Sequence, residues 1–245
     1  MTETLLITGA SSDLGGALAR RLLDSHQELQ VIAHSYRGGD RIQALKDEYG
    51  DRVYPVSADF SDHASVEKLA DEIVTRFGAP TQIVHLPALS LSYERFTKFN
   101  FDHFHRDMAV QVESAVILLK KFAAKMSKMP SARIVFVLSS VTRAMPPKFM
   151  TMYTVIKYAQ LGLMRAVAAE YAATGLTVNA VSPSMIETQF LKEIGDVAVR
   201  MSAAANPKGR NALPEDVIGA IELLLSPAAA YMTGIDIPIT GGSSC

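Results

Sequence analysis

Short runs of apolar residues alternate along the chain with longer segments of helical period. Most of the runs consist almost entirely of Val, Ile and Leu, a composition typical of strands buried on both faces of a parallel sheet. We therefore expect seven strands, at Leu5–Thr8, Leu29–His34, Val53–Val56, Gln82–His85, Arg133–Leu138, Thr177–Val181 and Ile235–Ile239.

The segments between these runs have the apolar spacing of amphipathic helices. In Ser61–Phe77 the apolar positions recur every three or four residues, and Ser61 or Asp62 can serve as the N-cap. Asp102–Met126 and Tyr153–Ala173 also have a helical pattern. A repeated strand–helix–strand order implies right-handed crossovers. It predicts an α/β fold, a three-layer sandwich around a mostly parallel, seven-stranded sheet.

No linker or low-complexity stretch interrupts this order, so we expect one domain over residues 1–245. The longest break lies at about residues 187–214, where Gly195, Pro207 and Gly209 separate short helical pieces. A long excursion late in a regular sheet is usually functional, often a lid. We expect this segment to be a substrate loop.

Composition excludes several classes of protein. Of the 245 residues, 49% are hydrophobic and 20% charged, which suits a buried core, and the net charge of −1 supplies no electrostatic footprint for nucleic acid or an anionic membrane. The single cysteine, Cys245, forms no intrachain disulfide and fits a reducing compartment. The N-terminus lacks the basic region of a signal peptide, and no apolar run approaches the roughly 18 residues of a membrane helix. We expect a cytoplasmic protein.

A turn rich in small residues follows the first predicted strand, and a helix begins at about Leu14. Free backbone N–H groups and the helix dipole converge at such a turn, which makes it an anion site. Gly9 tightens the turn, and Gly15 allows the helix to approach the sheet. We expect a dinucleotide phosphate to bind here, at Gly9, Ser11, Ser12, Asp13 and Leu14.

The end of the second predicted strand bears on the choice between NAD and NADP. An acid usually holds a free 2′-hydroxyl at this place, whereas a 2′-phosphate needs a cation. No acid occurs between the end of this strand and Asp40. Arg37 lies in this stretch and can bind a phosphate bidentately, and Ser12 and Ser35 can add hydroxyls. The cofactor is therefore expected to be NADP(H). A solvated loop charge is the alternative interpretation of Arg37.

Ser140, Tyr153 and Lys157 form the strongest chemical signal. Tyr153 and Lys157 lie four residues apart and so share one face of a helix. Ser140 follows the fifth predicted strand, at the edge of the sheet where ligands bind α/β folds. Chance is a poor explanation for this spacing when it occurs together with the glycine turn.

These motifs resemble the short-chain dehydrogenase/reductase family, and the resemblance covers essentially the whole chain. Several of the matches are those of bacterial 3-oxoacyl-acyl-carrier-protein reductases. The resemblance implies a Rossmann-type fold. It further implies that Asp59 and Phe60 hold the adenine and that Ile186 and Thr188, in the segment after Pro183, contact the nicotinamide carboxamide.

The chain departs from the family pattern at three places. Asp13 stands where the middle glycine of the turn is expected, and His85–Ala88 stands where the family has an Asn-Asn-Ala-Gly motif. Gln111 stands where a helix asparagine usually completes the catalytic tetrad by holding a water relay to the lysine. Glutamine carries the same amide one methylene further out, so we expect Gln111 to be a secondary catalytic residue.

The resemblance also assigns roles to the reacting groups. Tyr153 is the acid in reduction, Lys157 tunes it and holds the nicotinamide ribose, and Ser140 positions the carbonyl oxygen. A ketone that accepts hydride develops alkoxide charge and therefore needs a proton donor and an aimed dipole. A neighbouring ammonium is expected to lower the pKa of the Tyr153 phenol. Ser139 is expected to be structural.

The sequence thus predicts an NADPH-dependent ketoreductase for a small or carrier-bound carbonyl, which the 3-oxoacyl thioesters exemplify. One alternative is a related cofactor-binding or interaction module with weak or no catalysis, and another is an oxidising dehydrogenase of a sugar or polyol. Family members form dimers or tetramers, so a homo-oligomer, a homotetramer in particular, is expected. No metal site is expected, because His103 and His105 are two residues apart and do not share a helix face.

Overall fold

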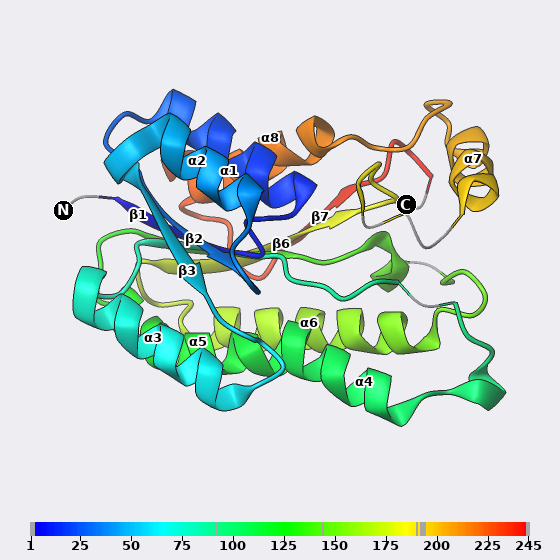
Figure 1. Cartoon of the computed structure of the whole chain (residues 1–245), viewed down its shortest axis with the longest axis horizontal. Coiled ribbons are helices and arrows are strands. Elements are labelled where there is room, and N and C mark those ends of the chain that lie inside the picture. The colour runs from blue at the N-terminus through cyan, green and yellow to red at the C-terminus, as the bar shows by residue number, and fades with distance from the viewer. Residues whose placement is uncertain (1–2, 92, 144, 190, 192–194, 244–245) are drawn as a thin grey trace.

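A seven-stranded sheet in the order β3-β2-β1-β4-β5-β6-β7 runs through the middle of the molecule (Figure 1). The structure is a computed structural model that describes residues 3–91, 93–143, 145–189, 191 and 195–243. Cys245 lies outside the described residues, as do residues 190 and 192–194 of the expected substrate loop.

All seven expected strands are confirmed, each within two residues of its expected ends, and every pair is parallel. The chain order reverses between β1 and β4, and a crevice opens at the carboxyl ends of the strands at such a switch point. The strands are β1 (Thr4–Thr8), β2 (Gln30–Ser35), β3 (Val53–Ser57), β4 (Gln82–His85), β5 (Ala132–Val137), β6 (Leu176–Pro183) and β7 (Asp236–Ile239).

Helices cover both faces of the sheet and form the three expected layers. α1, α2 and α8 lie on one face, and α3, α5 and α6 lie on the other (Figure 1). The helices are α1 (Asp13–Ser25), α2 (Asp40–Tyr49), α3 (His63–Phe77), α4 (Phe101–Met108), α5 (Ser114–Met126), α6 (Thr151–Glu170), α7 (Asp196–Ala205) and α8 (Pro214–Leu225).

Two hydrophobic cores, one on each face, hold the layers together. Phe122 of α5 and Phe136 of β5 are fully buried in the core under α3, α5 and α6. Leu18 of α1 and Ile221 of α8 are fully buried in the other core. The nearly continuous apolar strands therefore have the double burial that their composition predicts.

The segment expected as one helix, Asp102–Met126, is interrupted. A π-helical turn at Ala109–Glu113 separates α4 from α5. π turns shift the backbone hydrogen bonds by one residue and are frequent at functional sites. Gln111 lies at the centre of this turn, so its carbonyl is available to side-chain donors from β4 and α6.

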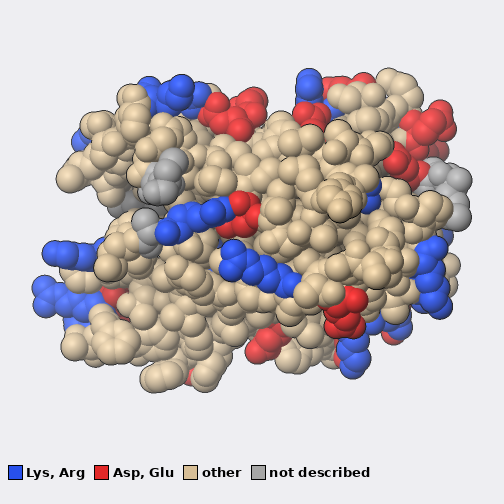
Figure 2. Space-filling model, turned by 180° about the vertical axis from the view of Figure 1, so that it is seen from behind, with Lys and Arg blue, Asp and Glu red and all other residues tan. Residues whose placement is uncertain are grey.

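The surface carries no strong charge bias on the face shown in Figure 2, where basic and acidic side chains are interspersed. Lys121, on the lysine-rich side of α5, forms an ion pair with Asp71 of α3. Among the described residues, no helix is long and apolar enough to cross a membrane.

Candidate active site

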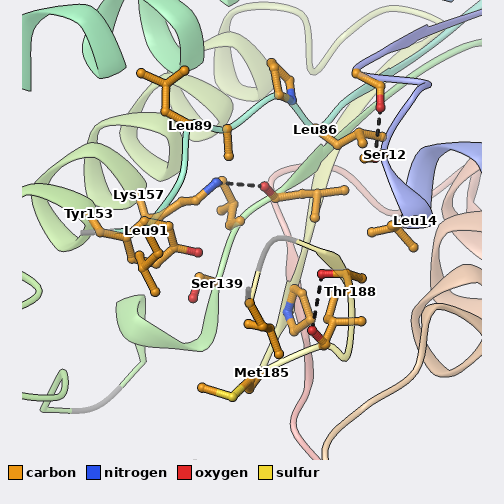
Figure 3. Close-up of a pocket in the computed structure, with 18 of the residues that line it drawn as sticks. Ser12, Leu14, Leu86, Leu89, Leu91, Ser139, Tyr153, Lys157, Met185 and Thr188 are labelled. Atoms are coloured by element: carbon orange, nitrogen blue, oxygen red, sulfur yellow. Dashed lines mark hydrogen bonds between the residues drawn. The ribbon is translucent and has the colours of Figure 1, made fainter. Parts of the chain in front are cut away.

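A cavity of about 740 Å³ opens at the carboxyl ends of the strands. The turns after β1 to β6 contribute to its walls, together with the first turns of α6 (Figure 3). Most of the expected site residues line it, namely Gly9, Ser11, Ser12, Asp13, Leu14, Asp59, Phe60, Ser140, Tyr153, Lys157, Pro183, Ile186 and Thr188. The expected residues Ser35, Arg37 and Gln111 are not among the described residues that line the cavity.

The turn after β1 has the close backbone approach that an anion site requires. Gly9 has a φ of 79°, a conformation that favours glycine. Ser12 is the N-cap of α1, and its Oγ accepts a hydrogen bond from Gly15 N at 3.0 Å. A Cβ atom on Gly15 would lie 2.6 Å from Gly9 O, so no larger residue fits without moving the turn.

Asp13, the acid in this turn, is neutralised by contacts that the sequence did not suggest. Its Oδ1 lies 2.8 Å from Arg41 Nη1, and its Oδ2 accepts a hydrogen bond from Gln189 N at 2.6 Å. Arg41 also donates to Ser11 O at 3.1 Å. The carboxylate thus faces a cation and a backbone N–H, which reduces its repulsion of a bound phosphate.

Arg41 lines the cavity near the turn after β1, whereas the expected Arg37 is not among the described residues that line it. The Arg37 guanidinium packs 4.6 Å from the centre of the Tyr36 ring and donates to Tyr36 Oη. Ser35 is buried, and its Oγ accepts from Gly38 N. Arg41 lies in the first turn of α2. Its position just inside the helix after β2 is the sequence feature from which it could have been identified.

The turn after β3 presents Asp59 and Phe60 to the cavity, as expected. Asp59 accepts hydrogen bonds from Ser61 N and Ser61 Oγ, and the hydroxyl bond in particular lowers the pKa of its carboxyl. The Phe60 ring stacks on His34 at 3.9 Å between ring centres.

Two buried histidines, His34 and His85, support the ends of β2 and β4. Gly9 N donates to His34 Nδ1 at 3.2 Å, and His34 Nε2 lies 3.1 Å from Ala58 O. His85 lies 3.0 Å from both Thr8 Oγ1 and Gln111 O. Burial lowers the pKa of His34 to about 4 and that of His85 to about 3, so both rings are neutral at neutral pH.

Tyr153 and Lys157 share one face of α6, as their spacing predicts, and both line the cavity. Ser139, which we expected to be structural, lies close enough to Tyr153 to lower the pKa of its phenol. Ser139 ends the extended segment after β5 and caps the short 3-10 turn at Ser140–Thr142. Ser140 also lines the cavity, but it is the first residue of that turn. Both neighbouring serines therefore line the cavity, and the spacing in the sequence did not single out Ser139 as a neighbour of the phenol.

The pKa of Tyr153 differs from the expectation. Burial raises it to about 12, and the hydrogen bond from Ser139 only partly opposes that rise. Burial also lowers the pKa of Lys157 to about 8. The expected lowering by Lys157 is absent because its Nζ donates to Val137 O at 3.2 Å and Gln160 Oε1 at 2.9 Å, and lies 5.6 Å from the Tyr153 ring centre. The phenol is therefore a neutral acid at neutral pH.

The glycine turn after β1, a tyrosine, and a buried serine and lysine thus meet in one cavity of a doubly wound sheet. A family model described as "Enoyl-(Acyl carrier protein) reductase" matches residues 9–244. The chain belongs to the short-chain dehydrogenase/reductase family. This places it among the dehydrogenases and reductases that interconvert CH–OH and C=O groups with NAD(P).

The relatives differ in substrate. The chain is 31% identical to a cis-4-hydroxycyclohexanecarboxylate dehydrogenase of Sinomonas cyclohexanicum, over 97% of this chain and 94% of the relative. It is 29% identical to a 3-oxoacyl-(acyl-carrier-protein) reductase of Vibrio cholerae, over 98% and 96%. A putative NAD(P)-dependent gluconate 5-dehydrogenase from Beutenbergia cavernae, solved with bound NADP, superposes with a TM-score of 0.89 at 26% identity, covering 98% of this chain and 96% of that one.

In this family member, apolar side chains surround the tyrosine. Leu91, Val141 and Met150 form a small cluster against which Tyr153 packs. Leu89 and Met185 line the cavity nearby (Figure 3). Sequence patterns did not identify Leu89 or Leu91, because a loop after β4 has no periodicity from which burial can be inferred.

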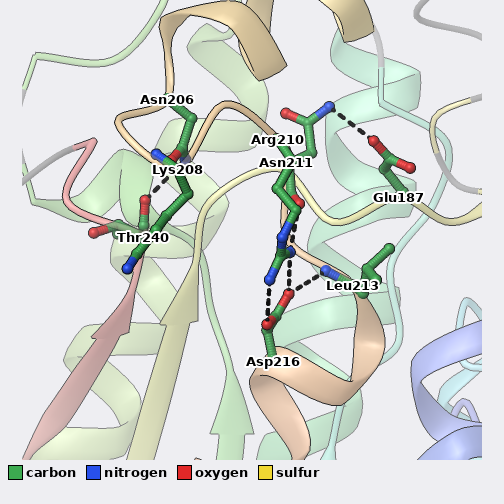
Figure 4. Close-up of polar contacts among 8 residues, drawn as sticks. All are labelled: Glu187, Asn206, Lys208, Arg210, Asn211, Leu213, Asp216 and Thr240. Atoms are coloured by element: carbon green, nitrogen blue, oxygen red, sulfur yellow. Dashed lines mark hydrogen bonds and ion pairs between the residues drawn. The ribbon is translucent and has the colours of Figure 1, made fainter.

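The segment at 187–214 is anchored at its far end by polar contacts (Figure 4). Arg210 forms a bidentate ion pair with Asp216 at the start of α8, with distances of 2.5 and 2.8 Å, and the hydrogen bond from Arg210 lowers the pKa of that carboxyl to about 2. Asn206 Nδ2 donates to Thr240 O at 3.0 Å. At its near end, Gln189 N is bound by Asp13, so the loop contacts the phosphate turn.

The buried histidines predict an acid-sensitive fold. The unfolded chain takes up a proton at each imidazole near pH 6.5, whereas folded His34 and His85 remain neutral down to about pH 4 and about pH 3. The free energy of unfolding should therefore fall as pH decreases below 6.5, by up to about 1.4 kcal/mol per pH unit for each histidine. Urea unfolding between pH 7 and 5 measures this slope.

The His34→Gln variant should show a smaller slope over the same pH range, whatever its stability at pH 7. The exposed His26→Gln substitution is the control and should retain the wild-type slope. An unchanged slope in His34→Gln would show that His34 is protonated in the folded protein.

Proposed function

We propose that this protein is an NADPH-dependent ketoreductase in which Tyr153 protonates the carbonyl oxygen. The observation that carries the proposal is the buried, neutral Tyr153 phenol beside Ser139, in the same cavity as Lys157 and the phosphate turn. The phenol holds its proton at neutral pH, so it can donate that proton to an alkoxide, which is a much stronger base than a tyrosinate.

The residues present fit a nicotinamide dinucleotide. The cavity extends from the turn after β1, across Asp59 and Phe60, to Pro183, Ile186 and Thr188. The glycine turn would hold the pyrophosphate, since it lines the cavity at the N-terminus of α1, where free backbone N–H groups favour an anion. Asp59 and Phe60 would hold the adenine, and Lys157 the nicotinamide ribose. When bound, the reduced cofactor supplies the hydride.

Arg41 supports a preference for NADP(H). The described cavity lining includes two acids, Asp13 and Asp59, and neither directly follows β2, where a ribose-binding acid would lie. Asp13 is paired with Arg41. The Arg41 side chain is 45% exposed and so can turn toward a 2′-phosphate without a large desolvation cost.

The side chains at the chemical end divide the work of carbonyl reduction. As hydride reaches the carbonyl carbon, its oxygen gains negative charge, and Tyr153 Oη transfers its proton to that oxygen. Ser139 Oγ donates a hydrogen bond to the same carbonyl oxygen and so orients the carbonyl group. The tyrosinate that remains then regains a proton from solvent, and Lys157 holds the cofactor ribose beside it.

An apolar substrate fits the walls around Tyr153 best. Leu91, Val141 and Met150 offer no hydrogen-bond partners for a sugar's hydroxyls. A carbonyl flanked by an alicyclic, aromatic or acyl group would bury its carbon frame there, and a 3-oxoacyl thioester belongs to this class. We also propose that the chain is a single domain and that it forms a homo-oligomer. On α6, Val155 and Tyr158 are about half exposed and Gly162 has open space above it, so a second copy could pack against this helix.

Tyr153→Phe tests the assignment of the proton donor. This variant should bind NADPH as the wild type does but lose at least about 100-fold in kcat, since a positioned acid contributes roughly 10²–10⁴-fold. NADPH consumption over cyclic and aromatic ketones, 3-oxoacyl thioesters and sugars identifies the substrate for the assay. Unchanged turnover would contradict the proposal. Failure of the wild type to bind NADPH would favour an interaction module.

The neighbouring serines provide a matched pair. Ser139→Ala should lower kcat by about 100-fold, the effect of losing one donor to the developing oxyanion. Ser140→Ala removes the same hydroxyl one residue later and should cause a much smaller loss. Steady-state kinetics on the best substrate compare the kcat values of the two variants. A larger loss of kcat in Ser140→Ala would assign the orientation of the carbonyl to Ser140.

Arg41→Gln and Arg37→Gln test the cofactor preference in the same way. Losing a charged phosphate contact costs about 1.5–3 kcal/mol, so Arg41→Gln should weaken NADPH by about 10- to 100-fold more than NADH. Arg37→Gln should leave the ratio of the two Kd values unchanged. Fluorescence titrations measure both, and a larger loss in Arg37→Gln would assign the phosphate to Arg37.

A further inference from the structure

Three polar side chains are buried beneath the cavity, behind Lys157. Asp107 of α4 is 7% exposed, and Gln111 and Gln160 are completely buried. None of the three is among the described residues that line the cavity. Burying polar groups in a core is costly unless each is bonded, so their partners show what they are arranged to do.

Hydrogen bonds connect Lys157 to the Gln160 side chain and Gln160 to the backbone of Gln111, and the Gln111 side chain separately binds Asp107. Lys157 Nζ donates to Gln160 Oε1 at 2.9 Å, and Gln160 Nε2 donates to the backbone carbonyl of Gln111 at 2.9 Å. Gln111 Nε2 donates to Asp107 Oδ1 at 2.6 Å. These bonds extend from α6 through the π turn to α4.

The two partners of the Gln160 amide allow it only one orientation. An ammonium only donates, so it requires the amide oxygen of Gln160. The Gln111 carbonyl only accepts, so it requires the amide nitrogen. A flipped Gln160 would lose both bonds, and the side chain is therefore locked in place by its two partners.

Locking Gln160 also positions the ammonium. Of the three N–H groups on Lys157 Nζ, one is bound by Gln160 and one by Val137 O at the end of β5. The third remains for the cavity, which Lys157 lines beside Tyr153. Gln160 therefore contributes to the direction in which the lysine presents its remaining proton.

Asp107 adds a countercharge. The Val137 carbonyl from β5 and the Tyr153 ring from its own helix lie against Lys157, and Asp107 from α4 and His85 from β4 interact with it electrostatically. His85 and Tyr153 are uncharged at neutral pH, so Asp107 is the group in this set whose carboxylate can offset the charge of the ammonium. His103 and the Leu89 backbone N–H also face Asp107. Burial raises the pKa of Asp107, whereas Lys157 and the hydrogen bond from Gln111 lower it.

We propose that Gln160 and Asp107 are positioning residues for Lys157, Gln160 by fixing its ammonium in the cavity and Asp107 by keeping that ammonium charged. This inference rests on the proposed function only for the part that Lys157 plays in turnover. In this arrangement Gln111 acts through two groups: its backbone carbonyl binds Gln160, and its side-chain amide binds Asp107.

Two conservative variants should move the titration of Lys157 in opposite directions. Asp107→Asn keeps an acceptor for Gln111 but removes the charge, so it should lower the pKa of Lys157 by about one unit, the low end of the effect of a facing charge. Gln160→Glu keeps the acceptor for Lys157 and adds a charge, so it should raise that pKa by a similar amount. NMR of the full-length protein labelled with 13Cε-lysine, with the signal assigned by its absence from Lys157→Met, measures these pKa values.

Turnover should follow the same order. The high-pH limb of kcat should move to lower pH in Asp107→Asn and to higher pH in Gln160→Glu, while Gln160→Leu should lower kcat by about tenfold with a smaller change in KM. Asp71→Asn removes an exposed carboxylate from α3 and should change none of these values. Circular dichroism establishes that each variant is folded.

A Lys157 titration identical to wild type in both Asp107→Asn and Gln160→Glu would overturn the inference, even if ketones are reduced. A shifted titration in a protein that reduces no carbonyl would instead uphold this positioning of Lys157 and reject the proposed function. The NMR measurement therefore separates the two failures.

Discussion

The burial of a lysine ammonium among apolar strands is the constraint on which the site depends. Lys157 is 3% exposed, and a charge at such a place is stable only if its protons are bound and its charge is offset. The end of β5, α6 and α4 contribute to this through Val137 O, Gln160 and Asp107, respectively, and the π turn provides the Gln111 carbonyl that binds Gln160. The interruption of the α4–α5 helix is thus part of the same arrangement, because it frees the Gln111 carbonyl for Gln160.

A similar compensation operates at the phosphate end. An aspartate in the turn after β1 opposes anion binding if the turn is considered alone. In the folded chain, Arg41 and the backbone of Gln189 neutralise it. The same contact joins the phosphate turn to the loop after β6, so the residue that departs from the family pattern links the two ends of the cavity.

Pattern reasoning succeeded where one local rule determines the outcome. Apolar runs of Val, Ile and Leu gave correct strands because double burial leaves no polar position, and the four-residue spacing of Tyr153 and Lys157 gave a shared helix face. It failed where the outcome depends on contacts distant in sequence. Arg41 reaches Asp13 across 28 positions, and the pKa of Tyr153 depends on how deeply α6 packs, so neither followed from local spacing.

The sequence by itself determined the α/β fold, the family and a set of site residues most of which line the cavity, because these follow from periodicity and from motifs a few residues long. Only the tertiary structure decided which serine meets Tyr153, which arginine faces the phosphate turn and what holds Lys157. Each of these depends on side chains brought together from separate strands and helices. Hydrogen bonds and charges act over a few ångströms, and only folding sets distances on that scale between such residues.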